Sequence, residues 1–569
     1  MRRKDLYRKK TIESILSSSR EEKFQLKREL KVRDLTAFGI AAIIGAGIFS
    51  TIGSAATHGG PAVSVLFLIT AIACGFSALC YAEFASAIPI SGSAYTYAYA
   101  SFGELVAWII GWDLIMEYAV GNVAVAISWS DYFTSFLSGM GIHFPDFLSI
   151  DYQTAYSGNH QVISLLSSGR HFSDIAMPLQ QAFHAWQSAP KIFGIPFIFD
   201  LPAFGIVFFI TWLVYIGIYE SKVAANAMVL LKIIVLMLVI GVGAFYVHPQ
   251  NWNPFAPNGL GGVLKGVSGV FFAYIGFDAI STTAEECKNP QKDIPKAMIL
   301  TLFITTILYI LISLVLTGMV NYKELGVADP LAYVFQKLHL TWFSGIIALS
   351  AIVAMAGVLL VFQVGQPRIW MSMSRDGLLP KIFSKLHLKY KTPAFATIIT
   401  GIVVAIPTIF VSFDEVIDLT SIGTLFAFVL VSGGVLLLDK KDLNKQNAYK
   451  IPFISSRFFI IPIWIVVFIL IMKFNYEGLT RFFYPDFTWA VFQHKIPLLV
   501  FIIAASTITY ICLLRDLSLI PVISLLANLY LMTELGITNW MRFIIWLVIG
   551  LVIYFTYSIK KSHLNALEI

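Results

Sequence analysis

The chain has 569 residues, of which 57% are hydrophobic and only 13% are charged, and its formal net charge is +7. Its mean hydropathy is +0.77. A water-soluble protein of this size cannot bury that much apolar surface, so the composition excludes a soluble globular protein. Apolar runs of about 20 residues recur along nearly the whole length, which predicts an all-α integral membrane protein.

The segment 1–33 is basic and polar and leads directly into the first apolar run. Its pairs Arg2-Arg3 and Lys9-Lys10 are compatible with contact to nucleic acid or to lipid headgroups. A basic tail beside a first span is more typical of a cytosolic anchor that follows the positive-inside rule. We therefore predict a cytosolic N-terminus and no nucleic-acid partner.

The first apolar run, about 35–56, has two glycines near its middle, in the sequence Ile43-Ile44-Gly45-Ala46-Gly47. Glycine costs about 1 kcal/mol in a helix interior and leaves backbone groups uncovered. In hydrocarbon, such groups are tolerated only where protein or a ligand satisfies them. The run is compatible with a broken helix or with a surface of small residues that packs against another helix.

A second interrupted run, about 260–285, favours the broken helix. It contains Phe271-Phe272-Ala273-Tyr274-Ile275-Gly276-Phe277-Asp278, with a glycine and a carboxylate in mid-span. Paired interruptions in corresponding positions of two halves are the best sequence signal for a transporter's binding site near the bilayer midplane.

Lysine and arginine are unevenly distributed among the connections. The tails and the even-numbered connections hold most of the 40 Lys and Arg residues, so the positive-inside rule places both termini in the cytosol. The predicted spans, about fourteen in number, are 35–56, 62–88, 104–136, 202–219, 222–247, 260–285, 296–320, 343–374, 393–412, 415–438, 455–474, 495–514, 517–533 and 540–559.

The first ten spans divide into two groups of five, 34–247 and 260–438, and each group opens with an interrupted helix. An odd number of spans inverts the second group relative to the first, which predicts an inverted-topology repeat. Four additional spans follow within 455–559, and 560–569 is predicted to be a cytosolic tail.

The outer connection 137–201 is unusually long and carries His143, His160, His171 and His184. Their wide and irregular spacing provides no helical ligand face, so we expect no metal site. The segment is compatible with a structured cap or with a loosely ordered insertion. The chain has no phosphate-binding loop, zinc motif or catalytic triad pattern, so we expect neither a cofactor nor an enzyme.

Charged residues inside spans are expensive and are functional by default. Lys232 lies about 15 Å along the fifth span, close to the middle of a hydrocarbon core of about 30 Å. Snorkelling is difficult from that depth, so the lysine must face protein. It is compatible with a titrating coupling group or with a fixed structural ammonium.

The third span places Asp113 and Glu117 on one helical face. Glu117 is compatible with contact to a substrate amine, with partnership to a protonatable group, or with a protonated packing role. Asp278 follows the second break and is comparably ambiguous. Glu83 lies toward the inner end of the second span, where we expect contact with a cytosolic loop.

Several motifs occur together in the chain. They are Gly45-Ala46-Gly47-Ile48-Phe49, Tyr81-Ala82-Glu83, Pro89-Ile90-Ser91-Gly92-Ser93-Ala94-Tyr95-Thr96-Tyr97, Ile110-Gly111-Trp112-Asp113, Glu285-Glu286-Cys287-Lys288-Asn289-Pro290, Gly365-Gln366-Pro367-Arg368 and Ser374-Arg375-Asp376-Gly377-Leu378-Leu379-Pro380. Each is weak alone. As a set they resemble the amino acid–polyamine–organocation superfamily, and specifically its cationic amino acid transporter branch. The resemblance covers about 32–438 and resumes at 518–562.

The resemblance implies the leucine-transporter fold, an inverted five-plus-five core with an amino acid bound between two broken helices. Free amide groups beyond the first break suit a substrate carboxylate, and carbonyls of the second break suit its ammonium. Lys232 stands where sodium-coupled relatives bind an ion and is implied to couple transport to protons. The predicted substrate-binding residues are Ile43, Ile44, Gly45, Ala46, Gly47, Glu117, Phe272, Ala273, Gly276 and Phe277, with Phe272 and Phe277 as gates or as ordinary core aromatics.

The eighth span is expected to present an apolar wall of Ser350, Ala354, Met355 and Gly357 to the substrate. That wall suits a small neutral side chain, whereas Glu117 favours a cationic one. The sequence predicts a secondary amino acid transporter of the cytoplasmic membrane that works as a proton symporter. An amino acid or polyamine exchanger and a non-transporting amino acid sensor are the alternatives. A channel would need a continuous polar lining, which the few intramembrane charges do not form.

Overall fold

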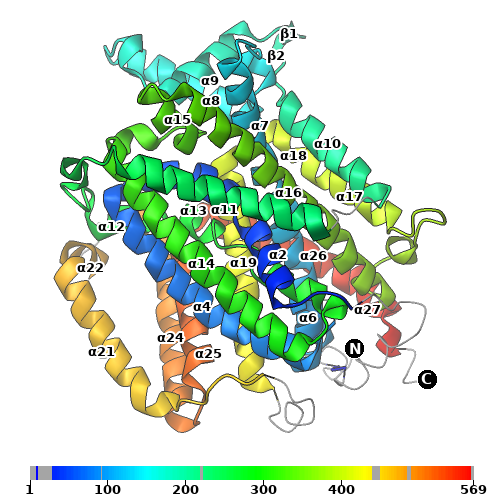
Figure 1. Ribbon diagram of the computed structural model, residues 1–569. Helices are drawn as coiled ribbons and strands as arrows, with labels where there is room; N and C mark the ends of the chain where they lie inside the picture. The colour runs from blue at the N-terminus through cyan, green and yellow to red at the C-terminus, as the bar shows by residue number, and fades with distance from the viewer. Residues whose placement is uncertain are drawn as a thin grey trace.

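The computed structural model describes residues 8–10, 28–90, 93–217, 222–438, 449–483 and 488–565. Most of the predicted N-terminal tail 1–33 and the end of the C-terminal tail 560–569 therefore lie outside the described residues. The described chain is almost entirely helical, and its helices form one bundle (Figure 1). This agrees with the predicted all-α membrane protein.

The first part of the bundle contains the first interrupted helix and the long segments that follow it. Its elements are α2 (Val32–Ile43), η3 (Gly47–Thr51), α3 (Ile52–Gly59), η4 (Gly60–Ala62), α4 (Val63–Ala87), α5 (Ser93–Ser101), α6 (Glu104–Ile115), η5 (Met116–Val120), α7 (Gly121–Gly139), α10 (Leu201–Tyr215) and α11 (Lys222–Ala244).

The second part contains the second interrupted helix. Its elements are η8 (Pro249–Trp252), α12 (Gly259–Leu264), α13 (Val267–Phe272), η9 (Asp278–Glu286), α14 (Pro290–Met319), η10 (Tyr322–Leu325), α15 (Pro330–Lys337), α16 (Thr341–Arg375), η11 (Lys381–Ser384), α17 (Ala394–Ala405), α18 (Pro407–Phe410) and α19 (Phe413–Leu437).

Of the C-terminal helices, α25 packs against α4 and α19, α24 packs against α25, and α21 lies beyond α24, whereas α26 packs against α19 and α6 (Figure 1). The C-terminal elements are α21 (Ser456–Phe474), α22 (Tyr476–Phe483), α23 (Trp489–Gln493), α24 (Ile496–Leu514), α25 (Leu519–Thr533), α26 (Gly536–Ile553), η12 (Tyr554–Ser558), α27 (Ile559–Lys561) and η13 (His563–Asn565).

Nine helical segments among the described residues are long and apolar enough to cross a membrane, and three shorter apolar helices accompany them. One long segment, Gly47–Ala87, joins the predicted first and second spans through the short turn η4. The chain is therefore a multi-pass membrane protein. The count of fourteen spans and the inverted repeat stay predictions.

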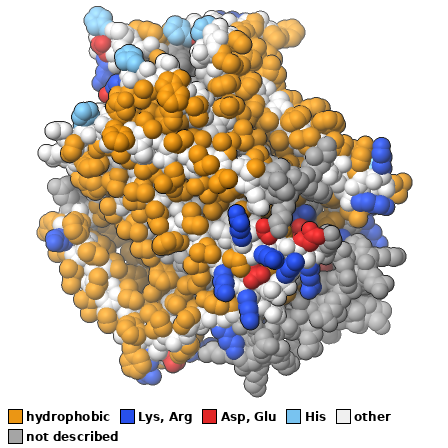
Figure 2. Space-filling view, viewed as in Figure 1, with side chains coloured by type: hydrophobic (Ala, Val, Ile, Leu, Met, Phe, Trp, Pro, Cys, Tyr) orange, Lys and Arg blue, Asp and Glu red, His pale blue; other side chains and the backbone are white. Residues whose placement is uncertain are grey.

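Hydrophobic side chains cover the sides of the bundle, as Figure 2 shows. On α21 and α26, for example, Phe458 is 73% and Ile545 is 60% exposed. In water such exposure would drive aggregation, whereas in a bilayer the lipid covers it. Lys and Arg gather near the end of the bundle that holds α27, and histidines lie on the opposite end (Figures 1 and 2).

The connection 137–201 is structured among its described residues, which favours the structured cap over the loosely ordered insertion. It forms η6 (Asp146–Leu148), α8 (Tyr152–Ser167), η7 (Phe172–Asp174), α9 (Met177–Ser188) and a two-stranded antiparallel hairpin of β1 (Lys191–Ile192) and β2 (Ile195–Pro196). Gly158 lets α8 and α9 cross closely, because a Cβ there would lie 2.4 Å from the Cβ of Ala182. We call this segment the cap.

Polar contacts close both ends of the core. At the end near the termini, Lys10 pairs with Asp376 and Arg368 lies 3.6 Å from Glu286. At the cap end, the hydroxyl of Ser135 donates to the carboxylate of Asp329 at 2.6 Å. Polar contacts thus join elements of the core at both of its ends.

Candidate functional site

The first break separates α2 from η3. Helix α2 ends at Ile43, and Ile44 turns to an extended conformation with ψ of 96°. The carbonyl of Gly45 accepts hydrogen bonds from the amides of Ile48 and Phe49, both at 3.2 Å. The helical segment that begins at Gly47 is a π-type turn, a form common at functional sites. The amides of Gly45, Ala46 and Gly47 donate no hydrogen bond among the described backbone hydrogen bonds outside helices, so these three are available to an anion.

The second break separates α13 from η9. Gly276 adopts a φ of +116°, which glycine tolerates far better than other residues. Among the described backbone hydrogen bonds outside helices, none uses the carbonyls of Ala273, Tyr274 or Ile275. This break therefore offers acceptors, as the first break offers donors.

The two breaks touch each other. A Cβ at Gly47 would lie 2.3 Å from the Cα of Ala273, and a Cβ at Gly276 would lie 3.0 Å from the Cβ of Ala42. The two interpretations of these glycines, a broken helix and a close packing surface, therefore both hold. The helix is broken, and the small residues also allow the two breaks to pack closely.

A cavity of about 10 Å³ lies where the breaks meet. That volume is close to the least that holds one water molecule, so the site is closed. Its lining is formed by Ala42, Ile43, Gly45, Ala46, Gly47, Val125, Phe272, Ile275, Val358 and Phe362. No residue in this lining carries a charge.

The predicted site residues separate into two groups. Those that line the cavity are Ile43, Gly45, Ala46, Gly47 and Phe272. Those that do not are Ile44, Glu117, Ala273, Gly276 and Phe277, and their binding roles stay predictions. Phe277 is fully buried and packs with ring centroids 6.0 Å from Tyr81 and 5.1 Å from Phe428.

The wall of the cavity on α16 differs from the expected one. Val358 and Phe362 line it, while Ser350, Ala354 and Met355 do not, and Gly357 lies near Lys232 instead. The wall is apolar as predicted. The residues that face the cavity differ from the expected ones because α16 is apolar on every side, so hydropathy does not show which side faces the breaks.

Lys232 on α11 is 1% exposed. Its ammonium donates hydrogen bonds to the carbonyls of Ala41, at 3.1 Å, and Ile44, at 3.2 Å. Tyr309 donates to the carbonyl of Ile43 between them, at 3.2 Å. These carbonyls form the C-terminal end of α2, where the helix dipole favours a cation. Lys232 therefore holds the broken end of α2.

Gly357 lies beside this ammonium, since a Cβ there would be in ordinary contact with Nζ of Lys232 at 3.5 Å. Helix α16 thus passes directly beside the lysine. Lys232 connects α11 to α2, with α16 as its neighbour, and any movement of α2 must change the surroundings of its charge.

A cluster of buried carboxyl groups lies beside the second break. Glu117, in the π-type turn η5, faces Asp278 at the start of η9. The hydroxyl of Tyr118 donates to Asp278 at 3.5 Å, and Asp113 is also buried. Among the described residues, no ion pair involves these three acids. Two facing carboxyl groups can share a proton through a hydrogen bond.

Glu83 reaches the connection before α21, since its carboxylate accepts from the amide of Ile451 at 2.9 Å. No group of three or more His, Cys, Asp or Glu residues able to hold a metal ion occurs in the described part of the chain.

Comparisons with known proteins match nearly the whole chain. A family model described as amino acid permease matches residues 30–505, and one for the C-terminus of these permeases matches 516–562. The branched-chain amino acid permease BcaP of Bacillus subtilis (strain 168) is 41% identical over 98% of this chain and 99% of its own length. The methylthioribose transporter of the same organism is 36% identical over 98% and 99%. Cationic amino acid transporter 2, vacuolar, of Arabidopsis thaliana is 30% identical over 99% and 93%.

Proposed function

The chain belongs to the amino acid permease family, and from that premise we propose that it is a proton-coupled secondary transporter of aliphatic amino acids. One observation carries the choice of substrate. The cavity between the breaks is lined by aliphatic and aromatic side chains and by no charged one. A cationic side chain would lose its hydration there without compensation, whereas a branched aliphatic side chain would gain from burial.

The backbone at the breaks suits the two charged ends of an amino acid. The amides of Gly45, Ala46 and Gly47 would bind the carboxylate, because they donate no described backbone hydrogen bond and lie at the positive end of the helix dipole. The carbonyls of Ala273, Tyr274 and Ile275 would accept from the ammonium. Phe272 would cover the bound substrate from the second break.

Binding requires the breaks to separate, because a cavity of about 10 Å³ has no room for an amino acid. In the proposed cycle, α2 moves away from α13 on one side of the membrane at a time. The site at the helix breaks is then exposed alternately to the two sides. The branched-chain permease is the relative whose named substrate agrees with this lining.

Lys232 is the proposed coupling group. As an ammonium it makes charge-assisted hydrogen bonds to the end of α2. Loss of the proton would weaken these bonds and favour movement of α2. Coupling then needs only that the lysine has different proton affinity in the two conformations, and each pKa unit of difference corresponds to about 1.4 kcal/mol.

The proposal includes the predicted topology. Both termini are cytosolic, 34–247 and 260–438 form the inverted repeat, and 455–559 forms the additional helices. The distribution of Lys and Arg supports this orientation. The variants His160→Cys, in the cap, and Lys385→Cys test it, because both positions are exposed and the four native cysteines are buried. A membrane-impermeant thiol reagent should label only the first in intact cells, and the opposite pattern would overturn the orientation.

Uptake by purified protein in liposomes tests the transport function. We expect leucine, isoleucine and valine to accumulate when the outside is acidic, and a protonophore to abolish the accumulation. Arginine, lysine and methylthioribose serve as competitors. Accumulation of arginine in preference to leucine would contradict the proposed substrate class. Uptake only into preloaded vesicles would indicate an exchanger, and binding without any uptake would indicate a sensor.

A further inference from the structure

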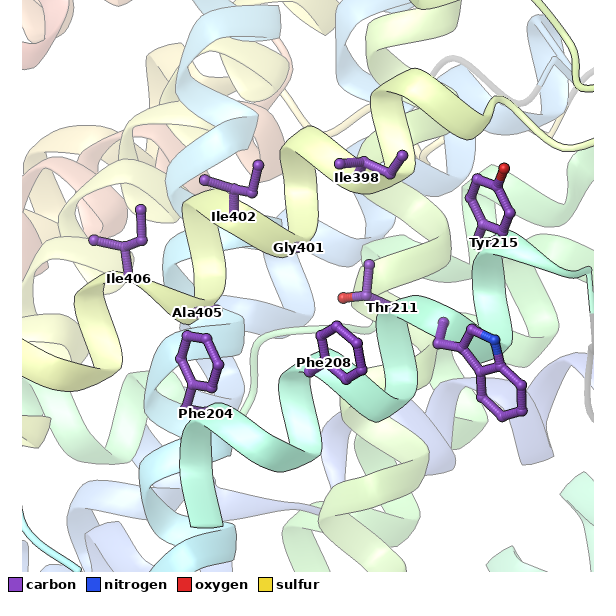
Figure 3. A pocket seen from close by; sticks show the side chains of 10 residues that line it. Phe204, Phe208, Thr211, Tyr215, Ile398, Gly401, Ile402, Ala405 and Ile406 are labelled. Carbon is purple, nitrogen blue, oxygen red and sulfur yellow. The ribbon is translucent and has the colours of Figure 1, made fainter. Parts of the chain in front are cut away.

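A groove of about 380 Å³ runs along the lipid-facing side of the bundle between α10 and α17. Figure 3 shows Phe204 and Phe208 on one wall and Ile398, Ile402 and Ile406 on the other. Phe208 is 69% exposed. The volume lies in the range of small-molecule sites, and the walls are almost wholly apolar.

Small residues form the floor of this groove. Gly401 and Ala405 lie between the walls (Figure 3), and a Cβ at Gly401 would come within 2.6 Å of Thr211. Thr211 accepts a hydrogen bond from Gln363 at 2.8 Å, and Gln363 in turn accepts one from Asn122 at 3.0 Å. The floor is thus fixed by contacts to α16 and α7, so the groove is already formed.

One end of the groove is strongly basic. Tyr215 lines this end, and its ring centroid lies 5.6 Å from His387 and 5.9 Å from Tyr390. These two rings belong to the segment 385–392, which we call the lysine turn. It is attached to α10 by a hydrogen bond of 2.8 Å from the hydroxyl of Thr392 to the carbonyl of Tyr215.

The lysine turn carries exposed ammonium groups beside an exposed apolar side chain. Lys385, Lys389 and Lys391 are exposed, and Lys389 lies 5.2 Å from the ring of Tyr390. Leu388 is 90% exposed. Among the described residues, no ion pair neutralises these lysines. An apolar tip surrounded by lysines fits the headgroup region of a membrane with anionic lipids.

We propose that the groove between α10 and α17 and the lysine turn form one binding site for an anionic glycerophospholipid. An acyl chain lies in the apolar groove, and the phosphate lies at Tyr215, Lys389 and Lys391. The assignment to the cytoplasmic leaflet rests on the topology proposed above. The binding itself does not.

Charge complementarity identifies this occupant. A groove for an ordinary annular chain needs no basic end, and a helix of a second copy would place its own apolar surface, not an anion, beside the lysines. Basic sites between transmembrane helices on the cytoplasmic side are suited to anionic headgroups. The site is specific because the aromatic ring of Tyr215 belongs both to the groove and to the contacts of the lysine turn.

Native mass spectrometry of the purified full-length protein tests the proposal. The probes are phosphatidylglycerol and phosphatidylcholine with identical acyl chains, added in detergent. We expect a retained phosphatidylglycerol adduct on the native protein and no comparable phosphatidylcholine adduct. The double variant Lys389→Gln/Lys391→Asn should weaken phosphatidylglycerol binding about 10- to 30-fold, since each lysine near anionic lipid contributes about tenfold or less. Asn suits position 391, whose φ is +57°.

The matched variants separate headgroup from chain. Ile402→Trp fills the groove and should displace the lipid, whereas Ile544→Trp, on the lipid-facing side of α26, should not. Lys560→Gln removes an exposed lysine outside the lysine turn and should leave binding unchanged.

Equal retention of both lipids, or unchanged phosphatidylglycerol binding in the double lysine variant, would overturn the proposal. So would a loss of binding upon addition of inorganic phosphate alone, which would indicate a free-anion site. Displacement of the lipid by dimer formation would assign the groove to a second copy. None of these readouts depends on the orientation in the membrane, so failure of the topology leaves the lipid test intact.

Discussion

The two helix breaks face one another, but the ionisable side chains at their helix ends are of opposite type, basic at the first break and acidic at the second. At the first break, the ammonium of Lys232 lies at the carbonyl end of α2. At the second, the carboxyl group of Asp278 lies at the amide end of η9. Each charge matches the local helix dipole. Both breaks therefore place an ionisable side chain where the helix dipole favours it, a basic one at a C-terminal end and an acidic one at an N-terminal end.

The difference lies in how fully the groups are bonded. The ammonium of Lys232 has carbonyl partners, whereas one oxygen of Asp278 and one of Glu117 receive no hydrogen bond from a described donor other than the proton that the two acids can share. Spare buried acceptors carry a free-energy cost unless a proton or ligand arrives. At the first break, Lys232 therefore fixes the end of α2 through hydrogen bonds. At the second break, the carboxyl oxygens of Asp278 and Glu117 can still accept a hydrogen bond from a further donor.

The largest effect is expected from a methyl group that obstructs the close contact between the two breaks. A methyl group at Gly47 would meet the backbone of Ala273 at 2.3 Å, whereas one at Gly45 would meet only the side chain of Val358 at 2.7 Å. A side chain can rotate and a helix backbone cannot. Because the transport cycle must return to this closed contact, Gly47→Ala should slow leucine counterflow at least about 100-fold, and Gly45→Ala less than about tenfold. Leucine counterflow in liposomes measures both.

Normal yield and a normal elution volume must accompany the Gly47→Ala result. If Gly45→Ala proves as damaging as Gly47→Ala, the backbone contact is not the cause, and the contrast between the two glycines fails.

The next largest effect is expected from substitution of Lys232 at the first break. Lys232→Ala leaves the carbonyls of Ala41 and Ile44 without this donor, at a cost of about 1–3 kcal/mol. We expect leucine counterflow to persist at a reduced rate while accumulation driven by a pH gradient disappears. Lys232→Arg retains a cation that does not deprotonate, so it should bind leucine and also lose gradient-driven accumulation. Accumulation by Lys232→Arg would show that the coupling proton is carried elsewhere.

A smaller effect is expected at the second break. Glu117→Gln keeps the size of the side chain and can donate to Asp278, but it cannot exchange a proton with it. We expect the pH dependence of leucine counterflow to change in shape while the rate at its optimum changes only a few-fold. Asp278→Asn is the matched variant. An unaltered pH profile in both would assign these acids to packing.

The sequence reveals the breaks because glycine contradicts the local helical pattern. Gly45, Gly47 and Gly276 interrupt apolar runs that would otherwise be continuous, so the positions of the breaks can be predicted without coordinates. Lys232 is visible for a similar reason, since its charge is exceptional at that depth. A sequence identifies residues whose type is unusual for an apolar helix, such as these glycines and this lysine.

The remaining residues that line the cavity are typical of an apolar helix, so the sequence does not identify them. Val125, Val358 and Phe362 are apolar residues in apolar helices, and nothing local marks the side that faces the breaks. Phe277 was expected at the cavity but packs against Tyr81 and Phe428, because the chain turns between Ala273 and Asp278 before η9 begins. The direction of a side chain after a break depends on backbone angles that sequence does not give.

The last and smallest effect lies outside both breaks, at Asp200 in the cap. Burial raises the pKa of Asp200 to about 7, against hydrogen bonds from Ser130 and from the amide of Ala203 that favour the ionised form. The unfolded value is about 3.9, so the folded protein binds this proton more tightly. The resulting stability is full below about pH 4 and is lost as the pH rises toward 7.

Asp200→Asn should remove this dependence, because an amide oxygen can accept the same two hydrogen bonds and still cap α10. We expect the melting temperature of the native protein to fall more steeply between pH 5 and pH 8 than that of Asp200→Asn. Leucine transport should change little, because Asp200 does not line the cavity between the breaks. Parallel melting curves would show that Asp200 is ionised in the folded protein. A large loss of transport would show that the cap and the breaks, treated above as separate, act together.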